Sequence, residues 1–166
     1  VRLSSGAACR AASSGASIAS VTRVSDSVYT VAVTGASGNG TLGLNLKSSG
    51  TGIADLAGNA ISAGATGQLY TLDNTAPSVV GISRTGAQYT SGGSVSFTVT
   101  FDGDVSGVSA GDFTLSKGNG VVASDNDITV SGSGSSYTVT VANVSGNGLL
   151  GLQLKSSGTG ISDRAG

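Results

Sequence analysis

The chain has 166 residues with 28 Gly, one Pro, one Cys and no Met, Trp or His, and its nine acidic residues are all Asp. Few strong helix formers and abundant Val, Thr, Ser and Gly predict an all-β protein with many turns. A net charge of −1 gives no electrostatic signal for binding to nucleic acid or an anionic membrane. The sequence contains no run of 18 apolar residues, so no transmembrane helix is expected.

One stretch occurs twice. Residues 42–58 read LGLNLKSSGTGIADLAG and residues 150–166 read LGLQLKSSGTGISDRAG, an offset of 108. In each copy three leucines alternate with small or polar residues, which predicts a half-buried strand, and a Ser/Gly/Thr loop follows. The long offset indicates a tandem repeat of a whole domain rather than a short solenoid period.

The first half of the chain contains five predicted strands. A small-residue stretch at 7–17 separates the first two strands and holds Cys9, which has no partner for an intrachain disulfide and is interpreted as a structural thiol. Gly38-Asn39-Gly40 predicts a tight turn. The strands are expected at 1–3, 18–24, 27–34, 42–46 and 68–72.

The second half begins after residues 73–77, a predicted linker that carries the only proline. This half has six predicted strands and no counterpart of strand 68–72. With that counterpart a full repeat would have about seven strands, the number in an immunoglobulin-like sandwich. The strands are expected at 78–83, 94–101, 113–116, 127–132, 136–141 and 149–154. The predicted core aromatics are Phe97, Phe101, Phe113 and Tyr137.

Three segments carry a resemblance: DNTAPSVVGI at 73–82, SVSFTVTFDGDVSGVSAGDFTLS at 94–116, and YTVTVANVSGNGLLGLQLKSSGTGISDRAG at 137–166. The sequence resembles bacterial immunoglobulin-like tandem repeats of large extracellular adhesins and other secreted β-strand repeat proteins. The stretch at 7–17 departs from that pattern because it is about four residues longer than its counterpart. The resemblance implies an extracellular structural module, often stiffened by calcium, without enzymatic activity.

The expected architecture is therefore all-β, with tandem immunoglobulin-like antiparallel β-sandwiches. Residues 1–72 are expected to be the C-terminal part of a first repeat, and 78–166 a second repeat that lacks its last strand. The first unit lacks a counterpart of 77–112 and the second a counterpart of 59–76. We expect either that the polypeptide continues at both ends or that neighbouring copies pack against the open edges, as in a filament.

Catalytic chemistry is hard to build from this composition, and we predict that the protein is not an enzyme. Without His, neither a Ser/His/Asp site nor a His-bearing zinc site is available, and a lone Cys cannot form a thiolate cage. A glycosidase pair would need two Asp, and a hydrolase would need a polar pocket. Lys47 and Lys155 each follow the repeated strand and are interpreted as edge-protecting lysines, with an intramolecular isopeptide as the alternative.

Four aspartates form the predicted metal site. If the second unit is a sandwich, antiparallel strand order brings the loops 102–112 and 155–166 to the linker end. Converging carboxylates repel one another unless a cation neutralises them, and calcium takes six to eight oxygen ligands. Asp73, Asp102, Asp104 and Asp163 are therefore candidate Ca²⁺ ligands. The alternative interpretation is solvated turn aspartates.

The leading functional prediction is a structural repeat of an extracellular adhesin stalk or surface filament that gives reach and stiffness. Its expected partners are neighbouring repeats of the same chain or other copies. The alternative is a carbohydrate- or protein-binding module of a secreted protein, for which Tyr70 and Tyr89 are the candidate aromatic contacts.

Overall fold

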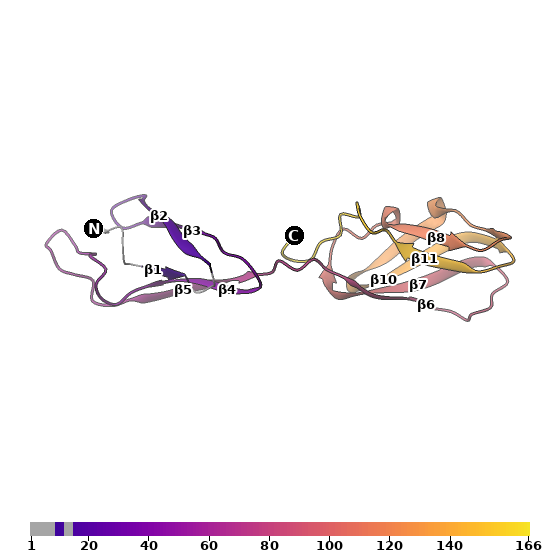
Figure 1. Cartoon of the computed structure of the whole chain (residues 1–166), viewed down its shortest axis with the longest axis horizontal. Helices are drawn as coiled ribbons and strands as arrows, with labels where there is room; N and C mark the ends of the chain where they lie inside the picture. The colour runs from indigo at the N-terminus through magenta and orange to yellow at the C-terminus, as the bar shows by residue number, and fades with distance from the viewer. Residues whose placement is uncertain (1–8, 12–14) are drawn as a thin grey trace. The chain divides into compact units, whose positions relative to one another are not determined.

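Antiparallel strands make up the fold, and the prediction of an all-β protein is confirmed. The computed structural model describes residues 9–11 and 15–166 and divides the chain into two compact units, Val1–Thr75 and Ala76–Gly166 (Figure 1). The division falls inside the segment 73–77 that carries the only proline. Each unit contains its own sheets.

The described residues of the first unit form two antiparallel sheets. One has the order β1-β4-β5 and the other pairs β2 with β3. The strands are β1 (Cys9–Ala11), β2 (Ser17–Arg23), β3 (Tyr29–Thr34), β4 (Gly40–Leu46) and β5 (Ala65–Leu72).

Strand β1 lies inside the small-residue stretch for which no strand was expected. An edge strand pairs through its backbone and needs no apolar alternation, so no periodic pattern marks it in the sequence. The strand expected at 1–3 lies outside the described residues.

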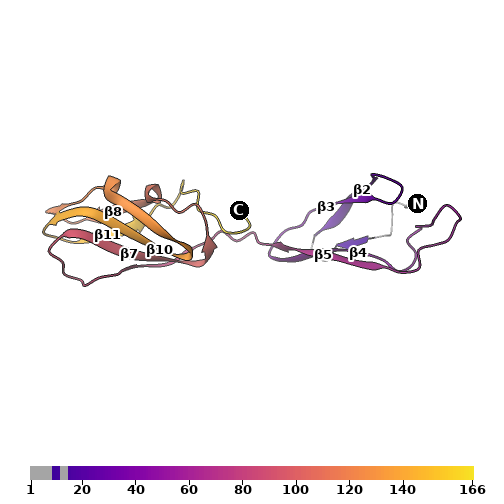
Figure 2. The ribbon, with the colours of Figure 1, turned by 180° about the vertical axis from the view of Figure 1, so that it is seen from behind.

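The second unit also contains two sheets, one of order β6-β7-β10-β9 and one that pairs β11 with β8 (Figures 1 and 2). Short 3-10 helices η1 (Ala110–Asp112) and η2 (Asp125–Asp127) precede β8 and β10. The strands are β6 (Val79–Arg84), β7 (Gly93–Val105), β8 (Phe113–Lys117), β9 (Val121–Val122), β10 (Ile128–Gly146) and β11 (Leu150–Leu154).

Strand β10 folds back on itself and forms two arms, residues 128–131 and 136–146. The Thr129 hydroxyl donates a hydrogen bond to the Thr140 carbonyl at 3.4 Å, so the two arms lie side by side. Gly132 and Gly134 adopt positive φ at the reversal, which glycine tolerates without steric cost. The second arm pairs with β7, and this agrees with the two separate strands expected at 127–132 and 136–141.

The hydrophobic core of the second unit lies between its two sheets. Most of its side chains come from β7 and β10, including Val99, Val139 and Val141, all at 0% exposure, and the other sheet adds Phe113 and Leu152. The prediction of four core aromatics is confirmed. These residues are Phe97, Phe101, Phe113 and Tyr137.

The first unit buries far less. Among its described residues no large hydrophobic side chain is buried, and the side chains of β5 are exposed from Ala65 to Thr71. Its counterparts of Val139 and Val141, which are Val31 and Val33, are only half-buried. The repeated strands therefore form in both units, but among the described residues only those of the second unit close a core around them.

Candidate functional site

The best-connected group of predicted site residues lies in the second unit, where the segments 102–106 and 162–164 meet the start of β6. Ser106 and Ser162 form an isolated antiparallel bridge, with backbone bonds of 2.8 and 3.2 Å. The two loops that antiparallel strand order was expected to bring together are therefore neighbours.

Asp102 is held by the residue that precedes β6. Its carboxylate accepts hydrogen bonds from the Ser78 backbone N–H at 2.9 Å and from the Ser78 hydroxyl at 2.7 Å. The Asp102 N–H donates to the Ser78 carbonyl at 3.0 Å, which makes the contact reciprocal. These bonds favour the ionised form and hold the pKa of Asp102 below its ordinary value. The Ser78 backbone N–H is the largest cause, and the Ser78 hydroxyl is the next.

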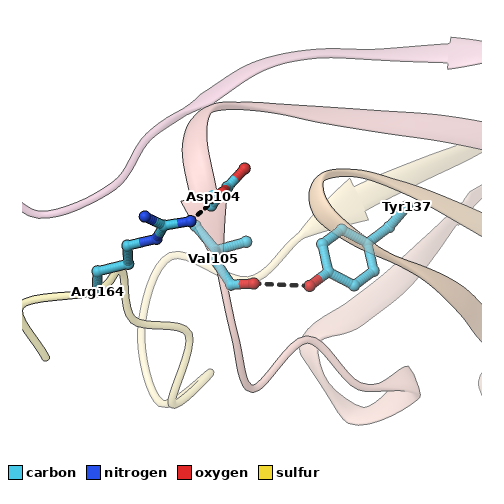
Figure 3. A network of polar contacts seen from close by, with 4 residues as sticks. All are labelled: Asp104, Val105, Tyr137 and Arg164. Carbon is cyan, nitrogen blue, oxygen red and sulfur yellow. Dashed lines mark hydrogen bonds and ion pairs between the residues drawn. The ribbon is translucent and has the colours of Figure 1, made fainter.

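Asp104 is neutralised by a cation of this chain itself. The Arg164 guanidinium lies 3.0 Å from the Asp104 carboxylate (Figure 3). Both side chains are more than half exposed, so the pair contributes little to stability. Its consequence is chemical, because a carboxylate paired with arginine is a weaker candidate for a metal ligand.

Arg164 was not among the predicted site residues. Its signal was the difference between the two repeated stretches, in which ISDRAG stands where the first copy reads IADLAG. The position of Arg164 is thus occupied by Leu56 in the first copy.

Tyr137 joins the end of β7 to the hydrophobic core. Its hydroxyl donates a hydrogen bond of 2.8 Å to the carbonyl of Val105, the last residue of β7 (Figure 3). Its ring meets Phe101 edge to face, with ring centroids 5.9 Å apart and an interplanar angle of 87°. A buried tyrosine hydroxyl needs such a partner, and the bond fixes the backbone that leads into the 105–112 loop.

The other two predicted ligands close local turns. The Asp163 carboxylate accepts from the backbone N–H groups of Ala165 and Gly166, and Asp73, in the first unit, accepts from the N–H of Thr75. In the first unit the counterpart of Asp163 is Asp55. Hydrogen bonds lower the pKa of Asp55, and the bond from the Asn59 side chain is the largest cause. These are the turn roles that were the alternative to a metal site.

No set of carboxylates is gathered around a common point in the described part of the chain. Among those residues no group of three or more His, Cys, Asp or Glu side chains is placed to hold a metal ion. Asp102, Asp104 and Asp163 instead accept hydrogen bonds from Ser78, from Arg164 and from the backbone of residues 165 and 166.

Lys155, the lysine of the second repeated stretch, contacts the loop that leads into β8. The Lys155 ammonium donates to the Gly111 carbonyl, at the end of the loop that leads into β8, and its backbone N–H donates to Asp112. This contact satisfies Lys155 without an Asp or Asn side chain as partner.

A hollow of about 460 Å³ lies at another place in the second unit, between the loop after β6 and the turn before β11. The lining includes Tyr89, Arg84 and Leu149, and Tyr89 is 87% exposed. Its volume is in the range of small-ligand pockets. Tyr70, the other candidate aromatic, lies on β5 in the first unit and is also exposed.

Comparisons with known proteins found no similar protein. No protein-family model matches the chain, and searches of curated proteins and of solved structures give no match. No helix in the described residues is long and apolar enough to cross a membrane.

Proposed function

We propose that the chain is a tandem pair of immunoglobulin-like antiparallel β-sandwich repeats, with about seven strands in a full repeat. Its proposed role is that of a structural repeat in an extracellular bacterial adhesin stalk or surface filament, where it gives reach and stiffness. Neighbouring repeats or other copies of the chain are the proposed partners.

The repeated pairing plan is the observation that supports this proposal most strongly. Strand β4 pairs with β1 so that Leu46 lies opposite Cys9, and β11 pairs with β8 so that Leu154 lies opposite Phe113. The β2–β3 turn closes with a backbone hydrogen bond from the Val24 N–H to the Val28 carbonyl. The two arms of β10 reverse between residues 132 and 136, which are the positions 108 residues later. One plan used twice is what a modular array requires.

A cell-surface test addresses the location. Antibodies raised against the whole chain should label intact cells of the source organism, and brief protease treatment of intact cells should remove the label. Labelling that appears only after lysis would contradict the proposed location.

A mechanical test addresses the role. In single-molecule pulling of the whole chain, we expect the second unit to resist as one cooperative event, because β7 and the second arm of β10 are joined along most of their length. Gradual extension without a force peak would contradict a role in stiffness.

Calcium stiffening remains a separate proposal. The described carboxylates do not fit a calcium site while Arg164 holds Asp104, so binding would require that ion pair to open. Melting should be compared with calcium and with chelator, in the wild type and in Arg164→Leu, which restores the residue of the first copy. A calcium-dependent rise in Tm in either protein would support the proposal, and identical melts in both would end it.

The hollow beside Tyr89 supports the alternative of a carbohydrate- or protein-binding module. The exposed Tyr89 ring offers a ligand a flat apolar face, and the hollow has the volume of a small-ligand pocket. A glycan array probed with the wild type and with Tyr89→Ala tests it. Binding lost in the variant would favour the alternative, and an array without signal would leave the spacer role preferred.

A further inference from the structure

One edge of β11 has no strand beside it in the described part of the chain. The sheet that contains β11 has only one other strand, β8. The far edge of β8 is covered, because the Leu115 N–H donates to Asp125 and the Lys117 ammonium donates to the Ala123 carbonyl. No described residue covers the far edge of β11 in this way, and an open edge is a template for another strand.

The register of β11 identifies the backbone groups on that open edge. Gly118 donates to the Leu149 carbonyl at 2.8 Å, and the Lys155 N–H donates to Asp112 at 2.8 Å. Since bonding alternates along an antiparallel pair, the odd-numbered residues of β11 face β8. The N–H and C=O groups of the alternating leucines therefore face outward. These residues are Leu150, Leu152 and Leu154.

The first unit shows what binds such an edge. Strand β4 has nearly the same sequence as β11, and its corresponding edge is occupied by β5 in antiparallel register, with Tyr70 opposite Leu42 and Leu72 opposite Gly40. The Leu44 carbonyl lies against Gly67 of β5, which confirms that this edge of β4 is the bonded one.

A side-chain clamp extends the contact beyond the strand. The Asn39 carboxamide accepts the Asn74 N–H at 2.8 Å and donates to the Thr75 hydroxyl at 2.6 Å. The turn sequence Ser-Gly-Asn-Gly is repeated before β11, where Asn147 stands in place of Asn39. The Asn147 side chain is exposed and makes no hydrogen bond to any described residue.

We propose that the β11 edge and Asn147 together bind an extended segment with the chemistry of residues 65–75. The segment would run antiparallel to β11, with its Tyr70 position opposite Leu150 and its Leu72 position opposite Gly148. Its Asn74 and Thr75 positions would bond to the Asn147 carboxamide. The partner is thus a strand of small, apolar and Thr residues that ends in Asp-Asn-Thr.

The probe is a fluorescent peptide of residues 63–75 added to the whole chain, with binding measured by anisotropy. We expect saturable binding that weakens about tenfold or more when the Tyr70 nitrogen of the peptide is methylated, because that N–H faces the acceptor edge. Methylation at Thr71, whose N–H faces away, is the matched control and should leave affinity within about threefold. Absence of saturable binding, or equal loss with both methylated peptides, would overturn the proposal.

Hydrogen exchange locates the bound peptide. Peptide should slow the exchange of the Leu150, Leu152 and Leu154 amides and leave Gly151 and Gln153 unchanged, since the latter already face β8. Protection elsewhere in the chain, with none at these three leucines, would contradict the assigned edge.

The two asparagines supply a matched pair of protein variants. Asn147→Ala should weaken peptide binding by about three- to tenfold, whereas Asn39→Ala should not, because Asn39 is already occupied by Asn74 and Thr75 of its own unit. An equal effect of the two variants would contradict the role of Asn147. The cell-surface and pulling experiments do not depend on this edge, so failure here is distinct from failure of the proposed function.

Discussion

The two units contain the same valine pair in very different surroundings. Val139 and Val141 of the second unit are fully buried, whereas Val31 and Val33, 108 residues earlier, are half-buried. The local sequences, TVTV and TVAV, are almost the same. The alternation of a strand therefore says which face can be buried, and the neighbouring strands decide whether it is.

The strand that makes this difference is β7. It pairs with the second arm of β10 and supplies Phe97 and Phe101 to the core of the second unit. Strand β3, which corresponds to that arm, pairs only with β2 among the described residues. The two aromatic residues of the first unit are Tyr29 and Tyr70, and the ring of Tyr70 is exposed.

The largest expected effect comes from removing a β7 ring. Phe101→Ala should lower the free energy of unfolding of the second unit by about 3–5 kcal/mol, because it leaves a cavity against Tyr137 and the valines of β10. Tyr70→Ala, at an exposed aromatic of the first unit, is the control and should cost less than about 1 kcal/mol. Urea unfolding followed by circular dichroism measures both, and equal losses would contradict the difference in packing.

A matched valine pair tests the same contrast more directly. Val139→Ala should cost about 1.5–3 kcal/mol, the contribution of a fully buried valine, and Val31→Ala should cost clearly less. Urea midpoints of the unit that carries each substitution give the comparison. If Val31→Ala cost as much as Val139→Ala, burial would not be the cause of the difference.

A smaller effect is expected from the Tyr137 hydroxyl. Tyr137→Phe keeps the ring against Phe101 but removes the 2.8 Å bond to the Val105 carbonyl, which should cost about 1–2 kcal/mol. Tyr89→Phe, at an exposed ring, should change stability by less than about 0.5 kcal/mol. Thermal unfolding reports both, and an unchanged Tm for Tyr137→Phe would mean that water replaces the bond.

The smallest expected effect is on the Asp102–Ser78 contact. The folded-state pKa of Asp102 is lowered from its ordinary 3.8, so its contribution to stability is present above that value and is lost as the pH falls through the folded pKa. Ser78→Ala keeps the backbone donor and removes the hydroxyl, so the pKa should rise part of the way back. An NMR titration of the Asp102 carboxyl carbon measures it, and an unchanged pKa would exclude the hydroxyl as a cause.

Periodicity predicted the strands of both units well. The alternation in 94–101 and 136–141 marked β7 and the second arm of β10, and it also identified the aromatic core. Strands β1 and β9 were not predicted because strands of three and two residues, paired through their backbones, leave no side-chain pattern.

The candidate site was less predictable. Strand order predicted that the loops 102–112 and 155–166 lie together, as the Ser106–Ser162 bridge confirms, but it could not say which side chains would bond. Arg164 pairs with Asp104 and Ser78 with Asp102, so each carboxylate has a partner from its own unit. Sequence reasoning counted the aspartates and gave no weight to the single arginine beside them.

Hydrogen exchange of the whole chain at residue resolution tests the central claim most directly, that one strand plan closes a core in the second unit and leaves the described strands of the first unit at most half-buried. We expect amides of β7 and of the second arm of β10 to exchange at least about a hundredfold more slowly than the amides of β2 and β3. Protection of β3 equal to that of the β10 arm would contradict the claim.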